Sequence, residues 1–185
     1  MNHSGSSILE NNDILLRPFI AKDAEMMYQN WCSDPEVTRF LTWLPHKNLD
    51  ETRTILQSWL HSYRRPDFYH WAIEIKKIAQ PIGSIGVVNL NEINEMAELA
   101  YCIGKVWWGK KIVVSALKLM IPYLFDTIGF ERLQAIHFTE NSASGRVMQK
   151  AGMQHEGTLR NYIKAKESHL VDCEIYAILK GDIVL

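Results

Sequence analysis

The sequence predicts a single domain of the α+β class, in which a largely antiparallel sheet packs against helices. Three consecutive runs alternate in polarity or are rich in β-branched residues, and only short turn signals separate them: Tyr69 to Lys76, Ile82 to Asn89 and Met96 to Ile103. Connections this short favour antiparallel neighbours. From Ile112 to Ile128 apolar residues recur at helical spacing, which predicts a helix with one broad buried stripe.

The part of the chain before these strands is expected to contain one strand and two main helices. Ile14 to Pro18 is predicted to be a short strand, and Ala21 to Cys32 a helix with one apolar stripe. Asp34, which precedes a proline, is a typical N-cap of a short helical turn. Asn48 to Tyr63 is predicted to be the second helix, because it opens with capping-box spacing and repeats apolar residues on one face.

The second half of the chain is expected to alternate between strands and helices. Pro122 lies inside the long predicted helix and is expected to bend it near Lys118, because proline removes one backbone hydrogen bond. The elements predicted after that helix are a strand from Arg132 to Thr139, a helix from Asn141 to Ala151, and two strands from Gln154 to Lys164 and from Leu170 to Lys180. Asn141 is the candidate N-cap of this helix.

Charge and cysteine content restrict the classes of partner. With 20 Lys and Arg against 21 Asp and Glu, the formal net charge is −1, so no general attraction to nucleic acid or to an anionic membrane is expected. The 3 cysteines have no CxxC spacing, which argues against a metal site and for a reducing compartment. The cytoplasm is therefore the expected location.

The chain length and the polar start of the sequence suggest simple domain boundaries. The 185 residues show no abrupt change in composition, which is typical of one core. The first residues lack the basic start and continuous apolar run of a signal peptide, and no stretch is long and apolar enough to span a membrane. Residues 1–12 are expected to be flexible, and residues 13–185 to form the domain.

The junction between the strand that ends at Ile103 and the helix that begins near Ile112 is a natural place for an anion. The first amides of a helix have no intrahelical partner, and here they would face the end of a strand. Water or a capping carboxylate would satisfy the same amides. The order of elements therefore leaves the ligand open.

Several stretches of the sequence are informative when their order and spacing are taken together. They are LLRPF, DAEMMYQNWCSDPEVTRFLTWLPH, WAIEI, PIGSIGVVNL, AELAY, WWGK, ENSASGRVMQKAGMQHEGTLR and VDCEIYAILK. Together they resemble the GNAT superfamily of acetyl-CoA-dependent N-acetyltransferases, in particular its ribosomal-protein (RimJ/RimL-like) branch. The resemblance runs from residue 15 to the end of the chain, and the NSASGRVMQKAGM helix followed by the EGTLR strand is its most specific part.

This resemblance implies a fold and a cofactor. The fold is a mixed, mostly antiparallel sheet of about seven strands flanked by four helices, splayed open near the strand Met96 to Ile103, with coenzyme A in the splay. It also implies a monomer or a homodimer. The residues that it assigns to cofactor binding are Tyr101, Cys102 and Ile103 on the strand, Trp108, Gly109, Lys110, Lys111, Ile112, Val113 and Val114 in the loop and helix start, and Asn141.

The pyrophosphate loop departs from the family pattern, which is Arg or Gln, two residues, Gly, one residue, then Gly or Ala. Laid onto Trp108 to Val113, the two small positions fall on Lys111 and Val113. If the loop enters the helix without positive φ, Lys111 could keep its amide inward and pair its ammonium with a phosphate. Alternatively, the side chains displace the pyrophosphate and weaken cofactor binding.

Two residues are candidates for acid and base chemistry. Glu98 lies at a strand position where the family commonly has a glutamate, and it is either a base with a raised pKa or a carboxylate paired with a cation. Ser144 occupies the position at which the RimL-like branch places a serine near the coenzyme sulfur; a first-turn serine can equally satisfy a backbone group. Cys102 is expected to be a small buried hydrophobe and not a nucleophile, because direct transfer needs none.

Aromatic segments are candidates for the acceptor pocket, although most such side chains in proteins belong to the core. The candidate segments are Phe40 to His46, Tyr69 to Trp71 and Tyr162, and the residues chosen from them are Trp43, Tyr69, His70 and Trp71. The expected function is acetyl transfer from acetyl-CoA to a primary amine, either a protein N-terminus or a small amine. The alternative is a degenerate family member that binds coenzyme A or another ligand without turnover, and Lys111 and Val113 motivate it.

Overall fold

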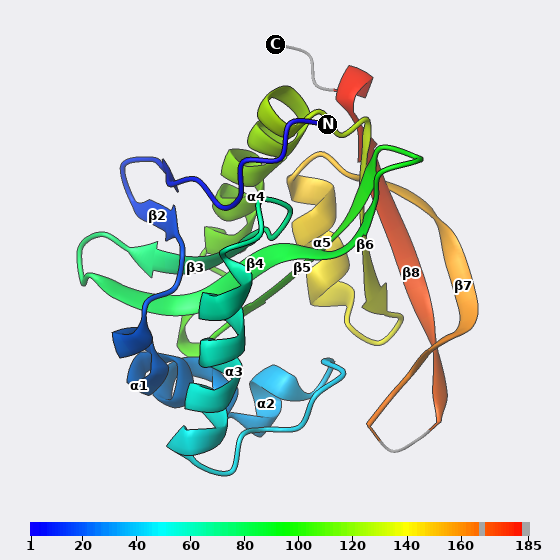
Figure 1. Cartoon of the computed structure of the whole chain (residues 1–185). Helices are drawn as coiled ribbons and strands as arrows, with labels where there is room; N and C mark the ends of the chain where they lie inside the picture. Colours follow the sequence, from blue (N-terminus) through cyan, green and yellow to red (C-terminus); the bar gives the residue numbers. More distant parts are fainter. Residues whose placement is uncertain (167–168, 183–185) are drawn as a thin grey trace.

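The computed structural model describes residues 1–166 and 169–182, which form one sheet with helices on both faces (Figure 1). The strand order is β1-β2-β3-β4-β5-β6-β8-β7. Neighbouring strands are antiparallel except β5 and β6, which are parallel. The described sheet has eight strands where about seven were expected, because the short β1 adds an edge strand beside β2.

The elements lie close to their predicted positions. The strands are β1 (Leu9–Glu10), β2 (Ile14–Arg17), β3 (His70–Ile75), β4 (Gln80–Asn91), β5 (Met96–Ile103), β6 (Arg132–Phe138), β7 (Gln154–Lys164) and β8 (Leu170–Leu179). The α-helices are α1 (Ala24–Met27), α2 (Pro35–Thr38), α3 (Leu49–Ser62), α4 (Ile112–Pro122) and α5 (Ser142–Lys150). The caps predicted for three of them are confirmed: Asp34, Asn48 and Asn141 accept hydrogen bonds from first-turn amides.

Two of the predicted helices are irregular. The segment predicted as one helix from residue 21 to residue 32 consists of a 3₁₀ turn, the short α1 and a π-helical turn. The long helix is α-helical only as far as Pro122 and continues as a π-helical segment, Tyr123–Ile128. Proline lacks the N–H that an α-helical hydrogen bond needs, which explains why the regular ladder ends there.

Successive side chains of the strands divide the core into two clusters, one on each face of the sheet. Trp71 and Ile73 of β3 pack in the cluster that contains buried side chains of α4 and α5. Ala72, which lies between them in the strand, packs in the other cluster with Met27 and Leu56 from the α1 and α3 side. This is the period of two that a strand imposes when both its faces are covered.

The sheet opens between β5 and β6. Their parallel pairing covers four residues of β5 and ends where Leu99 lies opposite Ala135. Along its other edge β5 stays paired with β4 as far as Ile103. Since Cys102 lies opposite Ser84 in that ladder and Gly104 donates to Ile82, the backbone groups of Tyr101 and Ile103 face the opening. The splay expected from the family resemblance is therefore present.

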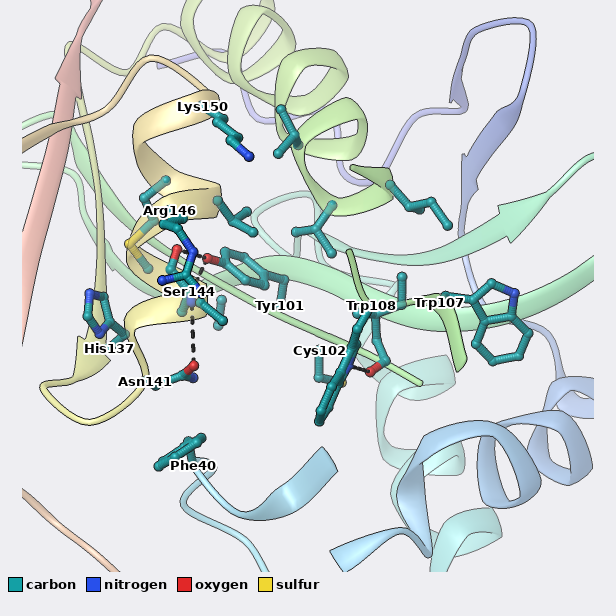
Figure 2. A pocket seen from close by; sticks show the side chains of 18 of the residues that line it. Phe40, Tyr101, Cys102, Trp107, Trp108, His137, Asn141, Ser144, Arg146 and Lys150 are labelled. Carbon is teal, nitrogen blue, oxygen red and sulfur yellow. Dashed lines mark hydrogen bonds between the residues drawn. The ribbon is translucent and has the colours of Figure 1, made fainter. Parts of the chain in front are cut away.

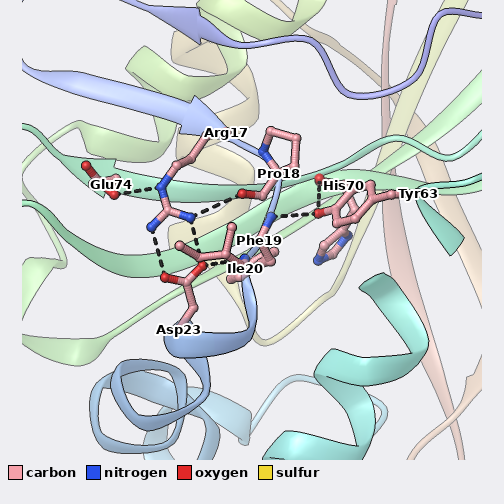
Figure 3. A network of polar contacts seen from close by, with 8 residues as sticks. All are labelled: Arg17, Pro18, Phe19, Ile20, Asp23, Tyr63, His70 and Glu74. Atoms are coloured by element: carbon pink, nitrogen blue, oxygen red, sulfur yellow. Dashed lines mark hydrogen bonds and ion pairs between the residues drawn. The ribbon is translucent and has the colours of Figure 1, made fainter. Parts of the chain in front are cut away.

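An ion-pair network fixes the start of the first helical segment to the sheet (Figure 3). Arg17 of β2 binds both carboxylate oxygens of Asp23, at 2.7 and 2.9 Å, and its Nε donates to Glu74 of β3 at 2.7 Å. The Asp23 side chain is 3% exposed. Nearby, the Tyr63 hydroxyl of the segment after α3 donates to the His70 carbonyl at 2.7 Å. These contacts connect the first helical segment and the end of α3 to the strands β2 and β3.

The N-terminal segment, for which the sequence indicates flexibility, is hydrogen-bonded to the domain in this structure. The Tyr123 hydroxyl donates to the Gly5 carbonyl at 2.7 Å, and the indole N–H of the fully buried Trp71 donates to the Ser7 carbonyl at 2.7 Å. Within the described residues, no helix has both the length and the apolar character needed to cross a membrane.

Candidate active site

A cavity of about 490 Å³ lies in the splay between β5 and β6 (Figure 2). Its walls come from β5, from the loop and first turn of α4, from β6, from α5, and from α2 with the residues after it. The residues that line it include Val37, Phe40, Leu41, Tyr101, Cys102, Ile103, Trp108, Gly109, Lys111, Ile112, Val113, Val114, His137, Asn141, Ser144, Arg146 and Lys150. The cavity therefore brings together most of the cofactor residues predicted from the sequence.

The charges around this cavity have one sign. Lys111, Arg146 and Lys150 line it, and no Asp or Glu is among the described residues that do so. Arg146 and Lys150 are one helical turn apart on α5, so both side chains reach the same wall. The chain as a whole has a net charge of −1, so this excess of cations is local. The cavity is suited to an anion.

The loop before α4 has a left-handed conformation at two positions. Gly109 has φ +74° and Lys111, the N-cap of α4, has φ +60° and ψ +12°. The sequence left open a loop that enters the helix without positive φ, and the structure does not have this conformation at Lys111. Lysine in this region costs about 1–2 kcal/mol because its Cβ approaches the carbonyl oxygen. No described side chain caps the helix, so the first-turn amides stay available to a ligand.

The other loop positions differ in their surroundings. Val113 is 6% exposed and packs in the core cluster beneath the first turn, although it also lines the cavity. Lys110 is exposed and is not among the lining residues. Of the two neighbouring lysines, Lys111 therefore lines the cavity and Lys110 does not.

Trp108 covers the open edge of β5. Its indole N–H donates to the Ile103 carbonyl at 2.9 Å, and its ring, 46% exposed, stands in the mouth of the cavity (Figure 2). The Ile103 carbonyl faces the splay, where no strand is present to pair with it. This tryptophan contact with the strand edge was not predicted from the sequence.

Three polar residues meet at the start of α5. The Asn141 side chain accepts a hydrogen bond from the Ser144 amide, as an N-cap does. The Tyr101 hydroxyl lies 2.8 Å from Ser144 Oγ and also donates to the Ser144 carbonyl at 3.1 Å. Burial raises the pKa of Tyr101, while the hydrogen bond with Ser144 lowers it by less. The Ser144 hydroxyl therefore lies at the cavity wall with a phenol behind it.

Glu98 lies on the opposite face of β5 from Tyr101. Its side chain is 9% exposed and accepts a hydrogen bond from Gln134 Nε2 at 3.2 Å. None of the ion pairs of the described residues includes it, so the paired-carboxylate alternative has no support. Glu98 does not line the cavity, and a water molecule would be needed to connect it with a ligand there.

Cys102 lies in the same strand, with its Sγ 3.4 Å from Ser84 Oγ. Burial raises the pKa of its thiol, so little thiolate is present near neutral pH. Cys102 is half-buried and lines the cavity, so it is less enclosed than expected, and its raised pKa is in line with the expectation that it is not a nucleophile.

The four aromatic side chains expected at the acceptor pocket lie elsewhere. Tyr69 and Trp71 are 1% and 0% exposed and belong to the core. His70 is enclosed between aromatic rings, including Trp59 at 4.3 Å between centroids, and burial lowers its pKa to about 4. Trp43 packs on the α1 and α3 side. The structure corrects this prediction: the β3 residues alternate between two buried faces, and neither face opens into the cavity.

The acceptor side of the cavity has other residues. Val37, Phe40 and Leu41 line it, and Phe40 and Leu41 also line a second cavity of about 480 Å³. Phe40 and Leu41 fall in the segment Phe40 to His46 that the sequence offered for this pocket, whereas sequence reasoning missed Val37, Arg146 and Lys150. The spacing of the two cations in RVMQK was a usable signal, since residues four apart share a helix face.

The sequence pattern of the family described as acetyltransferase (GNAT) domain matches residues 13–154. The chain belongs to this family. Membership makes it an N-acetyltransferase, and it confirms the fold that the sequence resemblance implied.

Relatives of similar length support this assignment. The N-acetyltransferase p20 of Bacillus licheniformis, itself uncharacterized, is 30% identical over 169 residues, covering 91% of this chain and 94% of that protein. The likewise uncharacterized N-acetyltransferase YoaA of Bacillus subtilis (strain 168) is 30% identical over 173 residues, covering 94% and 97%. The ribosomal protein uS5-alanine N-acetyltransferase of Escherichia coli (strain K12) is 30% identical over 83 residues, which is 43% of each chain.

Solved structures share the fold at lower identity. The crystal structure of a probable acetyltransferase superposes with a TM-score of 0.85 at 24% identity, covering 96% of this chain and 99% of that one. The microcin C7 self-immunity acetyltransferase MccE, solved in complex with acetyl-CoA and AMP, gives a TM-score of 0.81 at 20% identity, covering 91% and 93%.

Proposed function

We propose that this protein transfers the acetyl group of acetyl-CoA to a primary amine, either a protein N-terminal α-amine or a small amine, by direct attack of the amine. The observation that carries the proposal is the cavity in the splay. It combines the free amides of the α4 N-terminus with three cations and with the unpaired edge of β5, and no carboxylate is among its described lining residues.

The residues present fit coenzyme A. The first-turn amides of α4 and the Lys111 ammonium suit a diphosphate, and Arg146 and Lys150 suit a further phosphate. The outward backbone groups of Tyr101 and the amide of Ile103 suit the amides of the pantetheine arm, while the Ile103 carbonyl is bound by the Trp108 indole. The cofactor, when bound, supplies an activated acetyl thioester. The crystal structure of MccE with acetyl-CoA, a protein of the same fold, is consistent with this choice.

The chain supplies groups for both proton movements of the transfer. Glu98 would accept the amine proton through water, and Ser144 at the cavity wall would donate a proton to the leaving sulfur. An α-amine titrates near about 8 and a lysine near about 10.4, so an α-amine needs less help to lose its proton. A carboxylate that acts through water therefore favours an α-amine as the acceptor.

We place the acceptor on the side of the cavity lined by Val37, Phe40 and Leu41. The second cavity shares Phe40 and Leu41 with the first, so an extended acceptor such as a peptide would be able to contact both cavities. The Escherichia coli relative is named for the alanine of a ribosomal protein. A protein N-terminus is therefore the first acceptor to test.

Cofactor binding is measured first, by calorimetry with coenzyme A. Lys111→Gly keeps the left-handed backbone and removes the ammonium, so affinity should fall by about fivefold, the equivalent of about 1 kcal/mol. Lys110→Gly is the matched control, because its exposed ammonium lies outside the cavity. If Lys111→Gly raises the affinity, the side chain obstructs the phosphate and our assignment of Lys111 is wrong.

Turnover is measured next, as free thiol released from acetyl-CoA in the presence of N-terminal peptides and polyamines. We expect release above background with at least one α-amine acceptor and less with side-chain amines. Micromolar binding of coenzyme A without release on any acceptor would instead support the alternative of a binding module.

A further inference from the structure

Two hydroxyl groups from distant parts of the sequence meet at the cavity wall. Tyr101 lies on β5 and Ser144 on α5, and their oxygens are 2.8 Å apart (Figure 2). The Tyr101 hydroxyl is also 3.1 Å from the Ser144 carbonyl. A phenol has one proton, so it can be donated either to this carbonyl or to Ser144 Oγ. Only in the second arrangement is the Ser144 proton free to point at a ligand.

A serine acting alone is poorly matched to the leaving sulfur. A thiol titrates near about 8.5 and a tyrosine near about 10, whereas an alcohol is a far weaker acid than either. Proton transfer is most efficient between groups of similar pKa. Tyr101 is the one tyrosine among the described lining residues, which contain no carboxylic acid. Burial raises its pKa above that reference value, but a phenol remains a stronger acid than the serine alcohol, and its oxygen lies within hydrogen-bond distance of Ser144 Oγ.

We propose that Tyr101 positions the Ser144 hydroxyl and resupplies its proton, so that the pair acts as a single donor to the coenzyme sulfur. This inference rests on the proposed function. As the carbon–sulfur bond breaks, the Ser144 O–H bond gives its proton to sulfur, and the Tyr101 proton moves to Ser144 Oγ. The phenolate then takes up one proton from solvent, which has received the proton lost by the amine. Protons balance, and no further reactant is needed.

The surroundings of Tyr101 support this role. Its burial raises its pKa, which keeps the phenol protonated before each transfer and favours recovery of the proton afterwards. His137 is the other titratable ring at the cavity, and its nitrogens do not face Ser144 Oγ. Its Nδ1 lies 2.8 Å from the Phe138 carbonyl, and its Nε2 faces Gly145. Tyr101 is thus the titratable group that lies beside the Ser144 hydroxyl.

The first test needs no acceptor. The thiol pKa of coenzyme A bound to the protein is read from the ultraviolet absorbance of its thiolate as a function of pH. A hydrogen bond to a charged group contributes about 1.5–3 kcal/mol, so losing the oriented Ser144 proton should lower the bound thiolate fraction at least about tenfold. We expect this shift in both Tyr101→Phe and Ser144→Ala. Tyr176→Phe, which changes a tyrosine beneath α5 that does not line the cavity, should leave the titration unchanged.

The second test uses turnover. Tyr101→Phe and Ser144→Ala should each lower kcat by about 10²-fold with little change in coenzyme A affinity, and the double variant should lose no more than either alone. Losses that multiply, or a wild-type thiol titration and kcat in folded Tyr101→Phe, would overturn the inference. If wild-type protein binds coenzyme A but releases no acetyl group, the proposed function fails, and the thiol titration still decides the role of Tyr101. If coenzyme A does not bind, both proposals fail.

Discussion

Replacing Lys111 by glycine should stabilise the protein, although glycine usually destabilises a folded chain. Lys111 has φ +60°, in the left-handed region, and this conformation costs an ordinary residue about 1–2 kcal/mol. Glycine has no Cβ and avoids that cost, but it loses about 0.5–1 kcal/mol more in backbone entropy on folding. The difference predicts a gain of about 0.5–1 kcal/mol, or a rise in Tm of about 1–4 °C for a domain of this size.

Urea unfolding of wild-type protein, Lys111→Gly and Lys110→Gly measures the change in the free energy of unfolding, and the three proteins should have the same m value. Lys110 is equally exposed and does not have positive φ, so Lys110→Gly should lower the free energy of unfolding by about 0.5–1 kcal/mol. The two neighbouring lysines should therefore respond with opposite signs. If both variants are destabilised to the same degree, Lys111 carries no strain and the explanation of the loop is incorrect.

Three further changes test the packing around the site and the fold. Gly145→Ala should destabilise the protein by about 1–3 kcal/mol in urea unfolding, since a Cβ would lie 2.6 Å from His137 Nε2, and His137→Ala should relieve the loss; a gain in stability would contradict this packing. Arg17→Met should cost about 3–5 kcal/mol because it leaves Asp23 buried without a cation, and Arg17→Lys should cost less; a loss below about 1 kcal/mol in the methionine variant would count against the network. Burial lowers the pKa of His70 to about 4 in the folded protein, below its unfolded value, so its neutral form supports folding above about pH 6.5. As the pH falls toward 4, the free energy of unfolding should decrease by up to about 3 kcal/mol. His70→Gln should lack this part of the pH dependence, and identical pH profiles for the two proteins would exclude the effect.

The elements of the fold could be predicted from sequence because their signals are local. The cap residues Asp34, Asn48 and Asn141 accept the expected hydrogen bonds, and the period of the apolar residues identified α4. Local signals were weaker where neighbouring elements decide the geometry. The two-residue strand β1 exists only through its pairing with β2, and the π-helical turn after Pro122 depends on how the chain compensates for the missing N–H.

The sequence predicted the part of the candidate site whose residues are consecutive along the chain. The strand, the loop and the start of α4 are consecutive in sequence, so their residues had to meet, and the cavity contains them. The acceptor side could not be found in the same way. Tyr69 and Trp71 are aromatic and lie around the start of β3, but whether a face of this strand opens into a cavity depends on the helices that cover it.

The sequence by itself determined the order of the main strands and helices, the helix caps, the family and the loop proposed to hold an anion, because each depends on residues that are neighbours along the chain. Only the tertiary structure decided that Lys111 takes up a left-handed conformation, that Trp108 covers the edge of β5, and that Tyr101 reaches Ser144. These contacts depend on the distance between β5 and α5 and on the end of the β5–β6 pairing, and both are set by the packing of the whole sheet.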